Sequence, residues 1–166
     1  MLDHWKLDDA VIVGHSMGAL TLWQYLRDFG TERLSRVVFV DQSPRLVTDE
    51  NWRDGIYGDF DHARNADFIR ELEQDFAEAL LRLVAFGLND RARAKYLEDP
   101  GSLEKARQWL RRLPPEPLIA CWQSLTAADY RDVLATIDIP ALLIYGGESN
   151  FYRPRTAAYL RDTIPD

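Results

Sequence analysis

Residues 14–18, which read Gly-His-Ser-Met-Gly, are the stretch whose types and spacing could do chemistry. They match the pattern G-x-S-x-G, in which a serine hydroxyl attacks a carbonyl group. An apolar run at residues 10–13 precedes the serine and a helical pattern follows it, as this motif requires. Glycine on both sides would keep Cβ atoms out of a sharp strand-to-helix turn. We therefore expect Ser16 to be a nucleophile rather than only the N-cap of a helix.

The two neighbours of Ser16 have different expected roles. The N–H of Met17 lies at the start of the expected helix, where it can donate to a developing oxyanion. His15 is adjacent to Ser16, so its side chain should point away from the serine, and we expect it to shape the elbow or the floor of a binding pocket. His62 lies in a polar stretch and His4 lies near the N-terminus, so both are expected to be solvated.

Three apolar runs should form the sheet that positions Ser16. They span Ala10–Val13, Arg36–Val40 and Ala141–Tyr145, and nearly continuous runs of this kind are typical of parallel strands covered on both faces. Between the first two strands, apolar residues recur at helical spacing and Gly30 can end the helix. We predict an α/β core with three adjacent parallel strands in chain order.

A long helical insertion should separate the second and third strands. Parallel strands need only a dozen or more connecting residues, and the segment here is far longer. Residues 68–84 repeat their apolar positions every three to four residues, which predicts one amphipathic helix. Asp99-Pro100 should start another helix, and Pro114-Pro115 should end it. The expected division is a first core part at 1–46, a helical insertion at 47–129 and a second core part at 130–166.

The elbow resembles that of the α/β-hydrolase superfamily. Residues 129–134, Ile139-Pro140 and residues 142–146 resemble the cap-to-core return of esterase and haloperoxidase-like members. This resemblance implies a partial α/β-hydrolase core, in which the three strands are strands 5, 6 and 7 of an eight-stranded sheet. It also implies that the insertion is a helical lid that roofs the active site.

A serine nucleophile of this kind works in a catalytic triad with a histidine base and an acidic residue that orients the histidine. The acidic residue, the triad acid, is the least direct assignment in this sequence. Many family members carry an Asp after the seventh strand in a pattern like Gly-x-x-Asp, but Ser149 occupies that place here. Other members use a carboxylate at the end of the sixth strand, where this chain has Asp41. Glu148 remains an alternative, and Asp41 could instead only cap the following turn. We expect Asp41 to be the acid.

The resemblance implies a serine hydrolase that acts on an ester-like carbonyl through an acyl-Ser16 intermediate, with no metal or organic cofactor. The lid is rich in Phe, Leu and Trp, which favours a small-molecule substrate with an apolar or aromatic acyl group. The alternatives are a cofactor-free perhydrolase or haloperoxidase-like activity on the same triad, and a non-catalytic fragment or interaction module.

The resemblance also exposes a gap. The family's general base is a histidine after the last strand, and this sequence has no histidine after Tyr145. The family's second oxyanion donor comes from the first half of the sheet, which has no counterpart before the elbow. We therefore expect a truncated product that is inactive, or nearly so, on its own.

The composition limits the classes of binding partner that we expect for this chain. The formal net charge is -7, the sequence pI is about 5.0, and no basic stripe stands out, which argues against nucleic acid and anionic membranes as partners. The single cysteine, Cys121, excludes an internal disulfide. No leader or membrane-length apolar run is present, so a cytoplasmic location is expected. The oligomeric state stays open.

Overall fold

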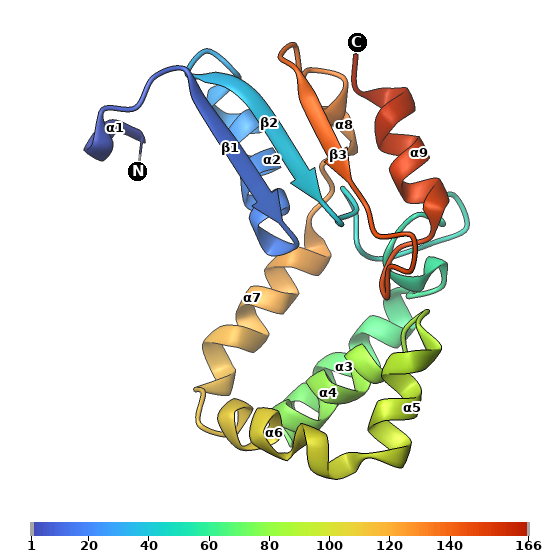
Figure 1. Ribbon diagram of the computed structural model, residues 1–166. Helices are drawn as coiled ribbons and strands as arrows, with labels where there is room; N and C mark the ends of the chain where they lie inside the picture. The colour runs from blue at the N-terminus through green and yellow to red at the C-terminus, as the bar shows by residue number, and fades with distance from the viewer. Residues whose placement is uncertain (1, 166) are drawn as a thin grey trace. The chain divides into compact units, whose positions relative to one another are not determined.

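A computed structural model describes residues 2–165, apart from the side chain of Pro100, and its contacts divide the chain into two compact units (Figure 1). The core unit comprises Met1–Arg45, Asp129–Gly147 and Arg153–Asp166. The helical unit comprises Leu46–Ala128 and Glu148–Tyr152. We expected the short segment Glu148–Tyr152 in the second core part, whereas its contacts group it with the helices.

The sheet of the core unit has three strands, β1 (Ala10–His15), β2 (Leu34–Val40) and β3 (Ala141–Ile144). Both neighbouring pairs are parallel and the order is β1-β2-β3. The predicted α/β class and the parallel strand order are therefore confirmed. Because the strands are parallel, their carboxyl ends lie at one edge of the sheet.

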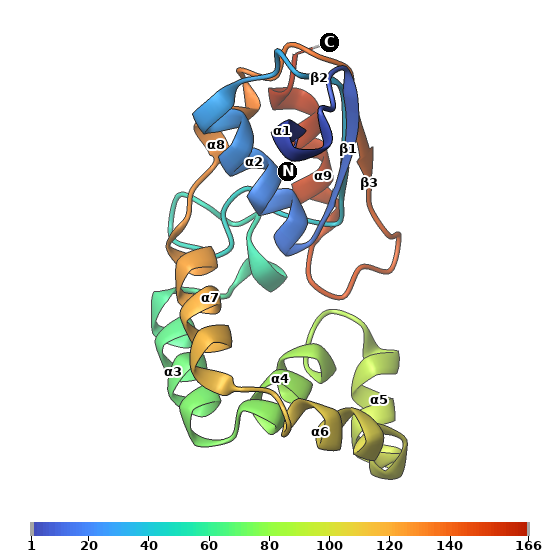
Figure 2. The same ribbon diagram turned by 90° about the vertical axis from the view of Figure 1, so that its left-hand side faces the viewer.

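Helices cover one face of this sheet. Figure 2 shows α2 (Met17–Phe29), α8 (Arg131–Leu134) and α9 (Pro154–Thr163) on the same side, and the short α1 (Leu2–Trp5) precedes β1. Trp23 of α2 is fully buried and stacks on Phe39 of β2 with ring centroids 4.9 Å apart. Gly30 has a positive φ of 67° and follows the end of α2, as predicted.

The other face of the sheet is open within the described residues, which corrects the prediction of cover on both faces. Val13 of β1 is 63% exposed and Leu142 of β3 is 55% exposed. Both are paired in register with Val38, so the three share this face. The apolar pattern is that of a doubly covered sheet, but residues 2–165 supply helices for one side only.

The helical unit is built around α3 (His62–Gln74), α4 (Phe76–Ala85) and α7 (Pro115–Ala127). Phe60, Phe68 and Trp122 form its aromatic centre, with the Phe68 and Trp122 rings 4.9 Å apart. No helix in the described part of the chain is both long and apolar enough to cross a membrane. The remaining elements are the 3-10 helices η1 (Ile56–Gly58) and η2 (Pro100–Leu103), and the α-helices α5 (Asp90–Glu98) and α6 (Glu104–Leu110).

The single helix predicted over residues 68–84 is wrong, because the chain turns at Asp75. This residue is extended, with φ -148° and ψ 90°, and it separates α3 from α4. Its carboxylate accepts a hydrogen bond of 3.1 Å from the N–H of Glu78 and so caps α4. An N-cap three residues before a glutamate is a helix-start signal that competes with the apolar period. Asp99 likewise caps a start, but the turn it begins is η2, and α6 follows.

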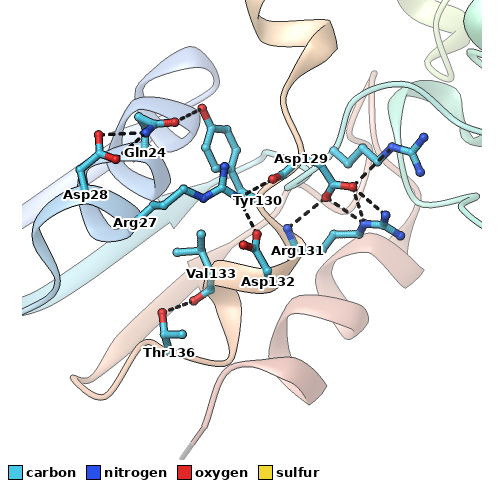
Figure 3. A network of polar contacts seen from close by, with 10 residues as sticks. Gln24, Arg27, Asp28, Asp129, Tyr130, Arg131, Asp132, Val133 and Thr136 are labelled. Carbon is cyan, nitrogen blue, oxygen red and sulfur yellow. Dashed lines mark hydrogen bonds and ion pairs between the residues drawn. The ribbon is translucent and has the colours of Figure 1, made fainter.

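A polar clamp joins the two points where the chain leaves the core unit at Arg45 and returns at Asp129 (Figure 3). The two residues form an antiparallel bridge, and the N–H of Tyr130 donates to the carbonyl of Pro44 over 2.9 Å. The Asp129 carboxylate accepts from Arg131 at 2.6 Å and lies 3.8 Å from Arg45 Nε.

Helix α2 reaches this clamp through Arg27. The Arg27 guanidinium donates to the carbonyl oxygen of Asp129 and to the carboxylate of Asp132, and it lies 4.8 Å from the centre of the Tyr130 ring (Figure 3). The Tyr130 hydroxyl donates a hydrogen bond of 3.1 Å to Oε1 of Gln24. Helix α2, which directly follows Ser16, therefore also holds the point where the chain returns from the helical segment.

Phe39→Ala should lower the free energy of unfolding by about 3–5 kcal/mol, because it removes a fully buried ring and leaves a cavity beside Trp23. Phe29→Ala is the matched control, since its ring is 68% exposed, and it should lower that free energy by less than about 1 kcal/mol. Urea unfolding followed by tryptophan fluorescence measures both changes. Equal losses would show that the Trp23–Phe39 stack is not the centre of this core.

Asp129→Asn should lower the free energy of unfolding by about 1 kcal/mol at neutral pH, since the pair with Arg131 is partly solvated. Burial of Asp129 raises the pKa of its carboxyl, but the hydrogen bonds and charges of Arg131 and Arg45 outweigh it and hold that pKa below its usual range. A lowered pKa stabilises the fold fully above the ordinary value of about 3.9 and loses this effect as the pH falls through the folded value.

The difference between the parent and Asp129→Asn chains should therefore shrink as the pH falls below about 4. Chemical unfolding at a series of pH values tests this. A difference that stays constant down to the acid limit would contradict the charged clamp.

Candidate active site

Ser16 lies on a strained turn between β1 and α2. Its φ is 52° and its ψ is -122°, a backbone conformation that side-chain-bearing residues rarely adopt and that costs roughly 1–3 kcal/mol. The Ser16 N–H donates to the carbonyl of Val40 at 3.3 Å, and its carbonyl accepts from Ala19 at 2.9 Å. The Ser16 side chain makes no capping hydrogen bond to α2. The hydroxyl is exposed and is not used as a helix cap.

Glycine is needed for close packing at only one of the two glycine positions of the motif. A Cβ added at Gly14 would lie 2.7 Å from the Cα of Ala19 and from the carbonyl oxygen of Gly18, so only glycine lets β1 meet α2 so closely. A Cβ added at Gly18 would meet no described atom within 4 Å. The expectation that both glycines relieve crowding is therefore correct for Gly14 and wrong for Gly18 within residues 2–165.

The sheet register puts Asp41 next to Ser16 in the edge where the strands end. His15 pairs with Val40, so Ser16 and Asp41 are the next residues along two neighbouring parallel strands. Asp41 also has a positive φ, 46°, and its N–H donates to the carbonyl of Ile144 at 2.8 Å. Two strained, polar residues thus follow adjacent strands at the edge where ligands bind in open α/β sheets.

Tyr145, for which the sequence predicted no site role, holds the backbone beside Asp41. Its hydroxyl donates to the carbonyl of Gln42. Burial raises the pKa of Tyr145, and the charge of Asp41 raises it further, so the phenol stays protonated as a donor. Gln42 and Ser43 are buried, and the Ser43 N–H donates to Oε1 of Gln42 at 2.8 Å. A tyrosine at a strand end is the one local signal that could have suggested this role.

Ser149 and Glu148 follow the third strand, where many members of the family carry the triad acid. Both residues lie in the helical unit. The Ser149 hydroxyl oxygen accepts from the N–H groups of Phe151 at 3.4 Å and Tyr152 at 3.2 Å, as a turn-capping serine does. The exposed Glu148 carboxylate pairs with Arg91 at 3.3 Å. Both side chains have structural partners within that unit.

The other predicted site residues are close to Ser16 in sequence but differ in placement. Met17 is the first residue of α2 and is half exposed, so its N–H belongs to the first turn. His15 is exposed, and strand alternation puts it on the open face opposite Gly14, which faces α2. His4 and His62 are exposed, as expected. Within residues 2–165, no group of three or more His, Cys, Asp or Glu side chains is arranged to hold a metal ion.

Comparison with known proteins places the whole sequence in one family. Residues 1–166 match the family described as alpha/beta hydrolase fold. A pimeloyl-[acyl-carrier protein] methyl ester esterase of Vibrio campbellii is 25% identical over 158 residues, which are 95% of this chain and 59% of that protein. A 3-oxoadipate enol-lactonase 2 of Acinetobacter baylyi is 26% identical over 149 residues, covering 89% and 49%. The chain thus spans less than two thirds of the length of these relatives.

Solved structures share the fold. A bromoperoxidase from Bacillus anthracis superimposes with a TM-score of 0.76 at 23% identity, over 99% of this chain and 59% of that one. An esterase from Exiguobacterium antarcticum gives 0.76 at 20% identity, over 98% and 57%. At these identities the likeness shows the common fold alone.

Gly14→Ala should lower the free energy of unfolding by about 2–3 kcal/mol, because its Cβ would press on the backbone of α2. Gly18→Ala is the matched control inside the same motif. It lies in a helix with open space around it, so its effect should range from nothing to a gain of about 1 kcal/mol. Chemical unfolding of the two variants compares them. Similar losses in both would contradict the close approach at Gly14.

Proposed function

Because the chain belongs to the α/β hydrolase fold family, we propose that the whole protein hydrolyses an ester-like carbonyl through an acyl intermediate on Ser16. The observation that carries the proposal is the strained elbow, where Ser16 has a positive φ and an exposed hydroxyl that does not cap α2. A conformation of this kind persists only where the surrounding structure imposes it, and such residues cluster at active sites. The esterase and lactonase names of the curated relatives support the same reaction class.

In the proposed reaction the Ser16 oxygen attacks the carbonyl carbon while its proton passes to a histidine base. The base then protonates the leaving alcohol, and the carbonyl carbon stays bound to Ser16 as an ester. Water, deprotonated by the same base, releases the acid and restores the hydroxyl. The N–H of Met17, in the first turn of α2, is the proposed oxyanion donor.

Asp41 is the proposed triad acid. It follows β2 in register with Ser16, and its backbone is held by Ile144 and by the Tyr145 contact to Gln42. An ionised carboxylate here would orient the histidine and stabilise the imidazolium that forms. Ser149 carries no charge, and Glu148 pairs with Arg91, so neither competes well for this role.

The base is proposed to come from outside residues 1–166. His4 and His62 are exposed residues of α1 and α3, and His15 stands on the open sheet face. Within the described residues of the core unit, neither His4 nor His15 forms a hydrogen bond to the Ser16 hydroxyl. A serine without such a partner is a weak nucleophile, so this chain alone should be inactive or nearly so.

The proposed substrate is a small ester with an apolar or aromatic acyl group. The helical unit supplies many aromatic side chains, among them Tyr57, Phe60, Phe68 and Phe86 around one cavity. Burial of apolar surface in such a pocket is the main source of small-ligand affinity.

Asp41→Asn in the whole protein should lower ester turnover by orders of magnitude, because it removes the charge that orients the base; the same change in a serine protease lowers kcat roughly 10⁴-fold. Ser149→Ala is the matched control and should change turnover far less. Steady-state hydrolysis of a nitrophenyl ester measures both variants. If the Ser149 variant is the damaged one, the acid lies after β3 and not at Asp41.

The purified 166-residue chain should hydrolyse a nitrophenyl ester no faster than its Ser16→Ala variant. Each sample is first checked for native far-ultraviolet circular dichroism, so that a loss of fold is not mistaken for a loss of chemistry. Robust turnover that disappears in the Ser16→Ala chain would place a base within these residues. The whole protein should show Ser16-dependent turnover in the same assay, and its absence there would refute the proposed function.

A further inference from the structure

A cavity of about 250 Å³ lies within the helical unit, bounded by η1, α3 and α4. Its apolar walls are Tyr57, Phe60, Phe68, Leu83 and Phe86. Charged side chains also line it, but they are paired: Arg64 contacts Asp59 at 2.7 Å, and Arg82 lies 4.0 Å from Glu71. These ion pairs leave the aromatic and aliphatic side chains as the uncharged part of the lining, and that part suits an aromatic or apolar group.

Tyr57 lines this cavity in a strained conformation. Its φ is 56°, and its hydroxyl donates to the carbonyl of Leu83, which also lines the cavity. Burial raises the pKa of Tyr57, so the phenol remains a donor at neutral pH. The guanidinium of Arg64 lies 5.1 Å from the centre of the Tyr57 ring. A strained conformation such as that of Tyr57 persists only where surrounding contacts hold it, and such residues cluster at ligand-binding sites.

The segment Glu148–Tyr152, which we call the strap, holds both walls. It lies in the connection between β3 and α9 (Figure 1). On one side the N–H of Tyr57 donates to the carbonyl of Phe151 at 2.7 Å, and the two rings stack with centroids 5.7 Å apart at an angle of 14°.

On the other side, Asn150 of the strap binds the turn between α4 and α5. Its Nδ2 donates to the carbonyl of Val84 at 2.7 Å, and its Oδ1 accepts from the N–H of Asn89 at 3.1 Å. Its own carbonyl accepts from the N–H of Leu88 at 2.9 Å. Gly87 makes this fit possible, because a Cβ there would lie 2.5 Å from the Asn150 carbonyl oxygen.

We propose that Asn150 is a positioning residue that sets the width of this cavity through the strap, and that the cavity is a binding site for an uncharged aromatic or apolar group. This inference goes beyond the proposed hydrolase function, which gives the strap no role because the triad acid is proposed at Asp41.

Hydrogen exchange on the 166-residue chain tests the positioning role without any need for activity. Asn150→Ala removes the acceptor of the Asn89 amide and should speed the exchange of that amide by about tenfold, as expected for losing one hydrogen bond. Gly87→Ala, whose Cβ would press on Asn150, should speed the exchange of the Leu88 and Asn89 amides by a similar factor. Gly147→Ala is the matched control in the neighbouring loop, since an added Cβ there meets no described atom within 4 Å. Unchanged exchange in both test variants would overturn the role of Asn150.

Should Asn150→Ala fail to fold, Asn150→Asp replaces it. The aspartate keeps the acceptor for the Asn89 N–H but loses the donor to Val84. We expect Asn89 to remain protected in this variant while ligand binding weakens. Binding as tight as in the parent chain would contradict the proposal.

Ligand binding is measured with benzyl alcohol on the Ser16→Ala chain by NMR. Signals of Tyr57, Leu83 and Phe86 should shift, and Asn150→Ala should weaken binding by about tenfold, while Gly147→Ala should not. Absence of shifts at these residues would overturn the binding site, whether or not the whole protein shows Ser16-dependent hydrolysis. Shifts there without any such hydrolysis would contradict the proposed function and leave the aromatic-binding pocket in place.

Discussion

The close approach of β1 to α2 is the constraint on which the rest of the core depends. Gly14 lets the backbone of the strand lie against Ala19, and the sharp turn between them is the one in which Ser16 takes a positive φ. Once α2 is fixed in this way, Trp23 meets Phe39 in the buried centre of the core. The last turns of α2 then bring Arg27 to the clamp at Asp129. Glycine at position 14 thus links the turn at Ser16, the hydrophobic core around Trp23 and the clamp where the chain returns to the core unit.

A second constraint acts at the neighbouring strand. Asp41 also has a positive φ, and the backbone around it is held from β3 by Ile144 and Tyr145. Ser16 and Asp41 therefore follow adjacent parallel strands in matching register, each on a turn that the surrounding hydrogen bonds impose. The loop after β3 is held by other contacts, because Asn150 binds Val84 and Phe151 binds Tyr57 in the helical unit. The strand end at Asp41 faces the turn at Ser16 in register, whereas the loop after β3 binds helical residues, and this difference is the physical basis for proposing the acid at Asp41.

Local patterns predicted much of this arrangement, and nonlocal contacts explain what they missed. Continuous apolar runs were enough for three parallel strands, and the spacing around Ser16 was enough for the elbow. The helix break at Asp75 was missed because a capping carboxylate outweighed an uninterrupted apolar period. Tyr145 and Asn150 act on residues far away in the sequence, Gln42 and Val84, which no local pattern connects to them. The sheet face that stays open within residues 2–165 was missed because an apolar strand looks the same whether or not a helix covers it.

The central claim is that the turn at Ser16 presents an activated nucleophile in the whole protein. The most direct measurement is peptide mass spectrometry after reaction with a fluorophosphonate probe. We expect one adduct, on Ser16, that is lost in Ser16→Ala and strongly reduced in Asp41→Asn, while Ser149→Ala is labelled normally. A folded whole protein that stays unlabelled, or an adduct on another serine, would contradict it.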